Sequence, residues 1–287
     1  KLVLLALLGA TAGQGVVWYT GQFYALFFLT ITLKLEYLEA YKVVALSLLL
    51  ATPFFIFFGW LSDKIGRLKI ILFGCLIAAL TYFPLFKALT HAVNPALEQY
   101  QQTTPITVAA SDCDLHIFVT PLTKFSECDR TKDFLTKSGL SFKSVPATGD
   151  AAVVTTIGTT QIKGWDEAKL KEALKATGYP AKADTAQMNY PATVGILFIM
   201  VLYVTMVYGP IAAFLVELFP TRIRYTSMSL PYHIGNGWFG GMLPLLATAM
   251  VAATGNIYYG LWYPIVVAVA TLIIGAIFLK ETKDVKI

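Results

Sequence analysis

Long runs without any charged residue constrain most strongly how this chain can fold. Asp, Glu, Lys and Arg are absent from Leu2–Leu33, Val43–Ser62, Ile70–Phe86, Met188–Val216 and Tyr225–Leu279. A helix needs about 20 such residues to cross about 30 Å of hydrocarbon. The last run is about twice that length and is interrupted at Thr254, Gly255 and Asn256. These runs are too long for barrel strands, so the sequence predicts six membrane-spanning helices whose backbone groups pair within each helix.

The composition supports a membrane location, and the basic residues suggest an orientation. Only 14% of the residues are charged, against roughly 25% in an average soluble domain. Basic residues of short connections tend to stay in the cytoplasm. The terminal side carries Lys1, Lys64, Arg67, Lys69, Arg222, Arg224, Lys280, Lys283 and Lys286, and the opposite side carries Lys34, Lys42 and Lys87. We therefore expect a multi-pass protein of the inner (plasma) membrane with cytoplasmic termini. The first run is too long for a cleavable signal peptide.

Residues 90–190 differ in composition from the two membrane blocks, residues 1–89 and 191–287. With this orientation, the segment is an insertion on the periplasmic or extracellular side. Cys113 and Cys128 lie within it, where an oxidising compartment would permit a disulfide, although two reduced or buried thiols are the alternative. The β-branched stretches 106–110 and 151–157 favour strands, and the helical periodicity of 166–176 favours a helix. The fold class expected is an all-α polytopic membrane protein with a small α+β insertion.

The insertion offers no pattern that predicts catalysis or nucleic-acid binding. Its acidic and basic residues nearly cancel, which gives no basic footprint for nucleic acid. The histidines of the chain, His91, His116 and His233, lack metal-ligand spacing. We therefore predict no catalytic residue, no metal and no cofactor, and a structural or interaction role for the insertion.

The connection between the second and third runs carries the strongest local pattern. Gly59, Asp63, Lys64, Gly66 and Arg67 occur within nine residues. Gly66 can adopt positive φ between two helix ends, and Arg67 offers a planar fork to a carboxylate or to helix carbonyls. The pattern suggests a latch between helices. The alternative is a turn glycine among ordinary cytoplasmic positive charges.

This segment resembles the cytoplasmic-loop signature of the major facilitator superfamily, G-x-x-x-D-[RK]-x-G-R-[RK]-[RK]. Lys69 also matches, whereas Leu68 departs from the basic residue that the pattern prefers. The segment from Glu217 through Pro220 to Arg222 and Arg224 resembles the E-x-x-P-x-R-x-R junction of sugar-porter-like members and metabolite:proton symporters. Together with the stretch that begins at Gln14, the likeness is closest to the metabolite:proton symporter family, and the insertion lies outside that family's usual pattern.

The resemblance implies helices seven to twelve of a twelve-helix transporter that works by alternating access. The N-terminal six-helix half would be its partner, and protons and a small metabolite, an organic acid or a zwitterion such as proline or betaine, would be its cargo. No charged residue lies in the middle of a run, so the coupling site is expected in the other half. A non-transporting membrane receptor or assembly subunit, with a ligand or partner bound at the insertion, is the alternative. An intramembrane enzyme fits least, because the runs lack a catalytic set.

The resemblance also implies that the first and fourth helices line the substrate cavity. At 100° per residue Gln14, Trp18 and Gln22 share one stripe of the first helix, and we expect them to face substrate, with Tyr203 added from the fourth helix. Helix–helix contact is the alternative for such amides. His233 could carry a proton, but is more simply a packing residue. The Gly9–Gly13 and Gly237–Gly241 spacings predict close helix contacts.

Overall fold

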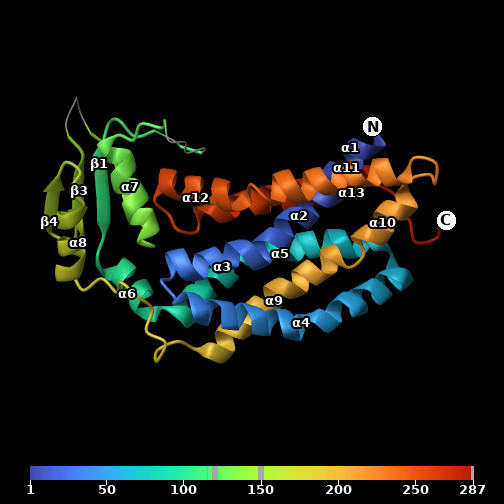
Figure 1. Ribbon diagram of the computed structural model, residues 1–287, viewed down its shortest axis with the longest axis horizontal. Coiled ribbons are helices and arrows are strands. Elements are labelled where there is room, and N and C mark those ends of the chain that lie inside the picture. The colour runs from blue at the N-terminus through green and yellow to red at the C-terminus, as the bar shows by residue number, and fades with distance from the viewer. Residues whose placement is uncertain (115, 118–121, 148–151, 286–287) are drawn as a thin grey trace.

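The computed structural model describes the chain except residues 115, 118–121, 148–151 and 286–287. Within the described part, six helices are long and apolar enough to cross a membrane. We call them spans 1 to 6: Leu2–Thr32, Tyr37–Ile65, Arg67–Val93, Tyr190–Leu218, Arg224–Thr254 and Tyr259–Phe278. The predicted fold class is therefore confirmed. Figure 1 shows the spans running along the long axis, with the sheet at one end and both termini at the other.

Spans 2 and 3 are continuous α-helices, whereas the other spans change geometry along their length. Span 2 is α4 (Tyr37–Ile65) and span 3 is α5 (Arg67–Val93). Span 4 consists of α9 (Tyr190–Tyr208) and α10 (Ile211–Leu218), separated at Gly209 and Pro210. Span 6 begins with the short η5 (Tyr259–Leu261) and continues as α13 (Trp262–Phe278). Two of these helices have an N-cap side chain. At the start of α4 the Glu36 side chain accepts a hydrogen bond from the backbone N–H of Glu39, and at the start of α9 the Asn189 side chain accepts one from that of Ala192.

Spans 1 and 5 contain π-helical turns. Span 1 alternates α1 (Leu2–Ala6), α2 (Ala12–Tyr19) and α3 (Ala25–Phe27) with the π-turns η1 (Leu7–Thr11), η2 (Thr20–Tyr24) and η3 (Phe28–Thr32). Span 5 is α11 (Arg224–Ile234), the π-turn η4 (Gly235–Gly240) and α12 (Leu243–Thr254). Such turns are often found at functional sites. Here η4 of span 5 packs against α2 and against the π-turn η1 of span 1, so π-helical turns of the two spans meet.

The spans differ in how much of their surface the chain itself covers. Spans 1 and 4 are each 61% buried over their most apolar stretch, whereas span 2 is 17% and span 5 is 28% buried. Spans 1 and 4 therefore occupy the interior of the bundle. Spans 2 and 5 leave large side chains uncovered, among them Leu49, Ile56, Tyr225 and Trp238. These two spans present apolar surface to whatever surrounds the bundle.

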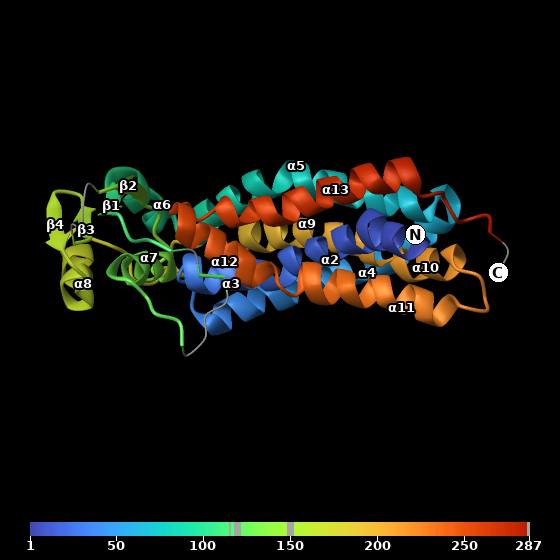
Figure 2. The ribbon, with the colours of Figure 1, turned by 90° about the horizontal axis from the view of Figure 1, so that it is seen from above.

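The insertion is a small α+β unit on one end of the bundle (Figure 2). Its described elements are α6 (Pro95–Thr103), β1 (Ile106–Ala110), α7 (Glu127–Lys137), β2 (Lys143–Pro146), β3 (Val154–Ile157), β4 (Thr160–Lys163) and α8 (Glu167–Ala176). The described strands form one sheet in the order β2-β1-β3-β4, with β1 parallel to β2 and antiparallel to β3. A disulfide joins Cys113 to Cys128 at the start of α7.

Hydrogen bonds attach the insertion to several spans at this end. The backbone N–H of Phe142 donates to Gly255 O at 2.7 Å, between spans 5 and 6. Asn94 Nδ2 donates to Leu33 O at 2.9 Å, and the N–H of Ala183 donates to Lys34 O at 3.0 Å, both just after span 1. The insertion therefore bridges the ends of spans 1, 3, 5 and 6.

Candidate functional site

The turn between α4 and α5 is built around Gly66. Its φ of 124° lies in a region that side chains with a Cβ rarely adopt. A Cβ placed on Gly66 would also overlap the carboxylate of Glu281. Glu281 Oε1 accepts a hydrogen bond from the Arg67 backbone N–H at 2.7 Å, which satisfies the open N-terminus of α5. Backbone geometry and the C-terminal segment thus fix this turn together.

Arg67 is the centre of a charged network at this end of the bundle. Its Nη2 lies 3.0 Å from Glu217 Oε1 at the end of span 4, and its Nη1 forms an ion pair with Asp63. The side chains of Arg67 and Glu217 are only 11% and 6% exposed. Ser62 Oγ accepts a further hydrogen bond from Nη1 at 3.0 Å. The guanidinium therefore connects spans 2, 3 and 4 through a pair that is nearly excluded from water.

Two residues of the C-terminal segment complete this network and were missed from the sequence. Thr282 Oγ1 donates to Glu217 Oε2 at 2.7 Å, and Glu281 holds the start of α5. The available signal was an acidic residue two positions after the last apolar run, on the side that carries Arg67. We call Ser62, Asp63, Arg67, Glu217, Glu281 and Thr282 the Arg67 network.

The remaining predicted gate residues lie outside the network. Arg222 is exposed and has no hydrogen-bond or ion-pair partner among the described residues. Arg224 donates from Nε to Phe219 O at 3.1 Å. The backbone oxygen of Lys64 accepts from Lys283 Nζ at 3.1 Å. Gly59 lies within α4, and a Cβ there would meet no atom within 4 Å.

A second group, of amides and aromatic rings, joins spans 1, 4 and 5. Gln14 and Asn236 exchange two hydrogen bonds, at 3.1 and 3.0 Å. The hydroxyls of Tyr208 and Tyr232 lie 3.1 Å apart, and the ring of Trp18 lies 5.7 Å from that of Tyr208. We call these five residues the amide–aromatic cluster. Trp18, Tyr208, Tyr232 and Asn236 are all partly exposed.

The cluster contains some of the predicted substrate residues and excludes others. Gln14 is fully buried with its amide paired to Asn236, which is the helix–helix role that the sequence left open. Gln22 is half-buried in η2, about one turn beyond Trp18. Tyr203 lies elsewhere, with its hydroxyl 3.1 Å from Thr81 Oγ1 of span 3. Sequence reasoning missed Tyr208 and Tyr232, because aromatic residues are frequent in every span.

His233 lies at the edge of this cluster, with its ring 5.7 Å from that of Tyr232. It is exposed on α11, and its Nδ1 lies 2.8 Å from the backbone oxygen of Ser229. Its neighbours on that face are Tyr225, Thr226, Ser229 and Leu230. Among the described residues no acidic or basic group pairs with it.

Glycines allow span 1 to approach its neighbouring spans closely. Of the two glycine spacings predicted to form such contacts, one does so within this chain. A Cβ on Gly9 or Gly13 would collide with Gly275 or Thr271 of span 6, so this spacing is confirmed as a helix contact. Among the described residues a Cβ on Gly237 meets nothing within 4 Å, so the Gly237–Gly241 spacing does not form the predicted contact with another span of this chain. In span 5 the close contact with span 1 is made at Gly235, which lies so near Thr11 O that a Cβ would not fit.

Comparison with known proteins gives partial matches. Residues 173–287 match the family described as "Sugar (and other) transporter". A putative metabolite transport protein of Haemophilus influenzae is 44% identical over 92 residues, which are 31% of this chain and 19% of the relative. The glycine betaine/proline/ectoine/pipecolic acid transporter OusA of Dickeya dadantii is 32% identical over 95 residues, 32% of this chain and 19% of the relative. The matches thus span about a fifth of each relative's length. No solved structure matches significantly.

Proposed function

We propose that this chain, which belongs to the major facilitator superfamily, supplies six helices of a secondary active transporter for a small metabolite. The observation that carries the proposal is the Arg67–Glu217 pair, which is nearly excluded from water and ties three spans at the end that holds both termini. A charged pair in that position needs a reason beyond stability, because burying two charges costs about as much as their attraction returns. Holding one half of a transporter as a rigid body provides that reason.

The Arg67 network would act as part of a cytoplasmic gate. It fixes the ends of spans 2, 3 and 4 to the segment after span 6 through Glu281 and Thr282. When the two halves rock against each other, this end of the chain would move as one body. Spans 2 and 5 carry the uncovered apolar surface against which an N-terminal six-helix half would pack. In this arrangement the termini are cytoplasmic, the membrane is the inner (plasma) membrane, and the insertion (residues 90–190) is periplasmic or extracellular.

The amide–aromatic cluster is the proposed substrate-facing surface. Trp18, Tyr208, Tyr232 and Asn236 are partly exposed, so they can contribute rings, hydroxyls and an amide to a cavity shared with the other half. Gln22 extends this surface, and Gln14 holds Asn236 in position. A ligand with a compact apolar body and few polar groups suits such a lining. The compounds in the name of the Dickeya dadantii relative favour a zwitterion such as proline, and an organic acid is the other class of substrate that the sequence suggests.

Proton coupling would depend mainly on the other half. Every apolar run of this chain lacks Asp, Glu, Lys and Arg, so the described spans offer no carboxylate at mid-depth. His233 is exposed on span 5, one of the two spans proposed to face the other half, which makes it the candidate proton carrier of this chain.

Uptake by the full-length protein in proteoliposomes tests the proposal. We expect labelled proline to accumulate when the outside is more acidic, and a protonophore to abolish that accumulation. Trp18→Ala should raise the half-saturating concentration. Trp262→Ala is the matched control, because Trp262 lies on span 6 against Phe83, away from the cluster. Gradient-independent uptake would reject proton coupling, and equal effects of the two substitutions would reject the cluster as the substrate surface.

The alternative is a non-transporting receptor or assembly subunit that uses the insertion to bind a ligand or partner. The firm docking of the insertion onto four span ends keeps this alternative open. It predicts that the reconstituted protein moves no solute under any gradient while a ligand or partner still binds to the insertion.

A further inference from the structure

A pocket of about 370 Å³ lies where the insertion meets span 5. One wall consists of α7 and the segment that contains Asp114 and His116. The other wall is the last two turns of α12, where Thr248, Ala249 and Ala252 present small side chains. The pocket therefore has a charged wall from the insertion and a largely apolar wall from a membrane helix, and it lies outside the amide–aromatic cluster.

Lys132 of α7 lines this pocket and is 9% exposed. Its ammonium group has no hydrogen-bond or ion-pair partner among the residues that the structure describes. Burial lowers the pKa of Lys132, and the nearby Asp129 offsets this only in part. The Lys132 side chain is mostly buried, while its Nζ stays accessible from the pocket. An anionic group in the pocket would therefore find an unpaired partner of opposite charge.

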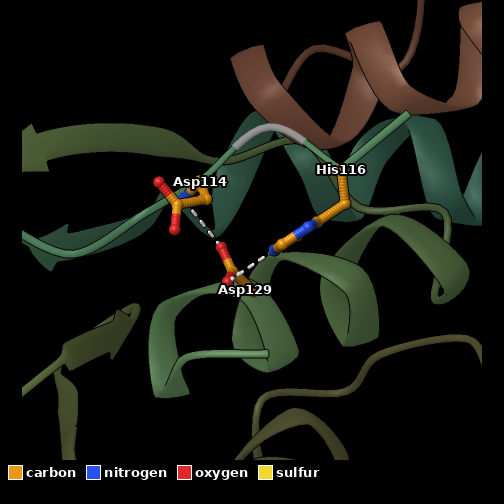
Figure 3. A group of neighbouring side chains, drawn as sticks. All are labelled: Asp114, His116 and Asp129. Carbon is orange, nitrogen blue, oxygen red and sulfur yellow. Dashed lines mark hydrogen bonds and ion pairs between the residues drawn. The ribbon is translucent and has the colours of Figure 1, made fainter. Parts of the chain in front are cut away.

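Most of the other charged groups around Lys132 already have a hydrogen-bond or ion-pair partner. Asp129 accepts hydrogen bonds from His116 Nε2 and from the backbone N–H of Asp114, each at 2.9 Å (Figure 3). It also accepts one from the backbone N–H of Ser126 at 2.9 Å. Lys137 Nζ is paired with Asp133 at 2.6 Å. The Asp114 carboxylate, by contrast, is exposed and makes no hydrogen bond or ion pair with any described residue. The pocket thus offers one unpaired cation and one unpaired carboxylate.

These groups favour an organic ligand over a metal ion. Asp114, His116 and Asp129 could each offer one ligand atom within 4.8 Å of the others. However, both Asp129 oxygens already accept N–H donors, and the bond from the Ser126 N–H closes the capping box at the start of α7. A cation would have to displace His116 from Asp129. It would also leave Lys132 unpaired and add a positive charge beside it.

We propose that this pocket binds a small zwitterion, with its carboxylate on Lys132 and its positively charged nitrogen facing Asp114. Phe125 and the alanines of α12 would cover the apolar body of the ligand. The site would receive solute on the insertion side of the membrane, before the solute reaches the cavity between the halves. Only this last role depends on the proposed transport function, because binding itself needs just the insertion and span 5.

A cysteine placed in the pocket can report its occupancy directly. Thr248 is exposed, and its hydroxyl donates only within its own helix, to Pro244 O at 2.7 Å. The cysteines of this chain do not interfere, because Cys113 and Cys128 are joined and Cys75 is buried, and any further cysteine of the full-length protein is first replaced by serine. In the full-length Thr248→Cys protein we expect L-proline to slow labelling by a maleimide. Cyclopentanecarboxylate, which lacks the nitrogen, should protect more weakly, and pyrrolidine, which lacks the carboxylate, should not protect.

Substitutions in the Thr248→Cys background then test each contact. Lys132→Met should raise the half-protecting concentration of proline by about tenfold or more, whereas Asp114→Asn should make proline no better than cyclopentanecarboxylate. Lys143→Met is the matched control, since Lys143 is an exposed lysine of β2 outside the pocket. An unchanged labelling rate without ligand shows that a variant keeps the fold of the pocket, and Asp114→Asn remains informative if Lys132→Met does not fold.

Three results would overturn the proposal. One is no protection by proline below about 10 mM, and another is protection that survives Lys132→Met. The third is protection by phosphatidylglycerol in place of solutes, which would make the pocket a site for lipid headgroups. The transport proposal fails separately: protection of Thr248→Cys without proline uptake rejects transport and keeps the pocket, and uptake without protection does the reverse.

Discussion

Arg67 and Glu217 form an ion pair that water scarcely reaches, and this makes each residue dependent on the other. With Arg67→Gln, the Glu217 carboxylate, which is 6% exposed in the unaltered protein, would keep Thr282 as its one hydrogen-bond partner among the described residues. Removing one partner of a buried pair typically costs about 3–5 kcal/mol. We therefore expect a clear fall in the Tm of the detergent-solubilised full-length protein, together with reduced uptake.

The double variant Arg67→Gln/Glu217→Gln is the control for this prediction. It removes both charges at once, so no unpaired charge is left buried, and it should be more stable than Arg67→Gln alone. If the Tm of the double variant recovers while its uptake stays low, the two charges are needed for transport and not for stability. A single variant as stable and active as the unaltered protein would show that the pair contributes to neither.

The pairing of Arg67 with Glu217 was foreseeable, but its completion by Glu281 and Thr282 was not. Charge patterning identified an arginine that needs a carboxylate and a carboxylate at the same membrane side. The contribution of Glu281 depends on the chain folding back after span 6, which apolar periodicity does not encode. Likewise, Tyr203 and Tyr208 are both aromatic residues of span 4. Only the packed helices place Tyr208 beside Trp18 and Tyr203 beside Thr81.

At the scale of elements, the turn between α4 and α5 allows a paired glycine test. Gly66→Ala would require a residue with a Cβ at φ 124° and would push that Cβ into Glu281. Backbone strain of this kind costs of order 1–3 kcal/mol. We expect a lower Tm and less uptake for Gly66→Ala, since the start of α5 would lose its hydrogen bond to Glu281.

Gly59→Ala is the matched substitution in the same signature. Gly59 lies within α4 and a Cβ there meets nothing within 4 Å, so alanine should be neutral or stabilise the helix by up to about 1 kcal/mol. Similar Tm losses for both variants would contradict the assignment of Gly66 as the special position. Thermal unfolding of the two full-length variants, measured side by side, decides this.

The elements that the sequence predicted are those with a strong local pattern. All six spans follow from apolar runs, β1 has the predicted bounds, and α8 begins one residue after the predicted start because Asp166 is its N-cap. The second predicted strand, 151–157, begins at Val154 in the structure as β3, and residue 151 lies outside the described residues. β2 and β4 were missed because each has four residues, so that only pairing with β1 and β3 makes them strands. α7 was missed as well, since its buried face includes Thr131, Lys132 and Thr136.

At the scale of the whole molecule, the insertion and the termini lie at opposite ends of the bundle (Figure 1). The basic residues favour a cytoplasmic position for the termini, which would place the insertion outside. Lys143 on β2 and Lys283 after span 6 are suitable reporters, because both positions are exposed or partly exposed and lie far from the spans' packed interior. We expect a membrane-impermeant maleimide to label Lys143→Cys in intact cells.

Lys283→Cys should be labelled only after the inner membrane is permeabilised. The cysteines of this chain leave little background, because Cys75 is buried and the other two form the disulfide between Cys113 and Cys128. The opposite labelling pattern would invert the orientation. It would place the Arg67 network outside the cell and the pocket that Lys132 lines inside it. The network could then not act as a cytoplasmic gate, and the pocket could not receive solute from outside. Because the insertion bridges four span ends, labelling at Lys143 reports the side on which that whole end of the bundle lies.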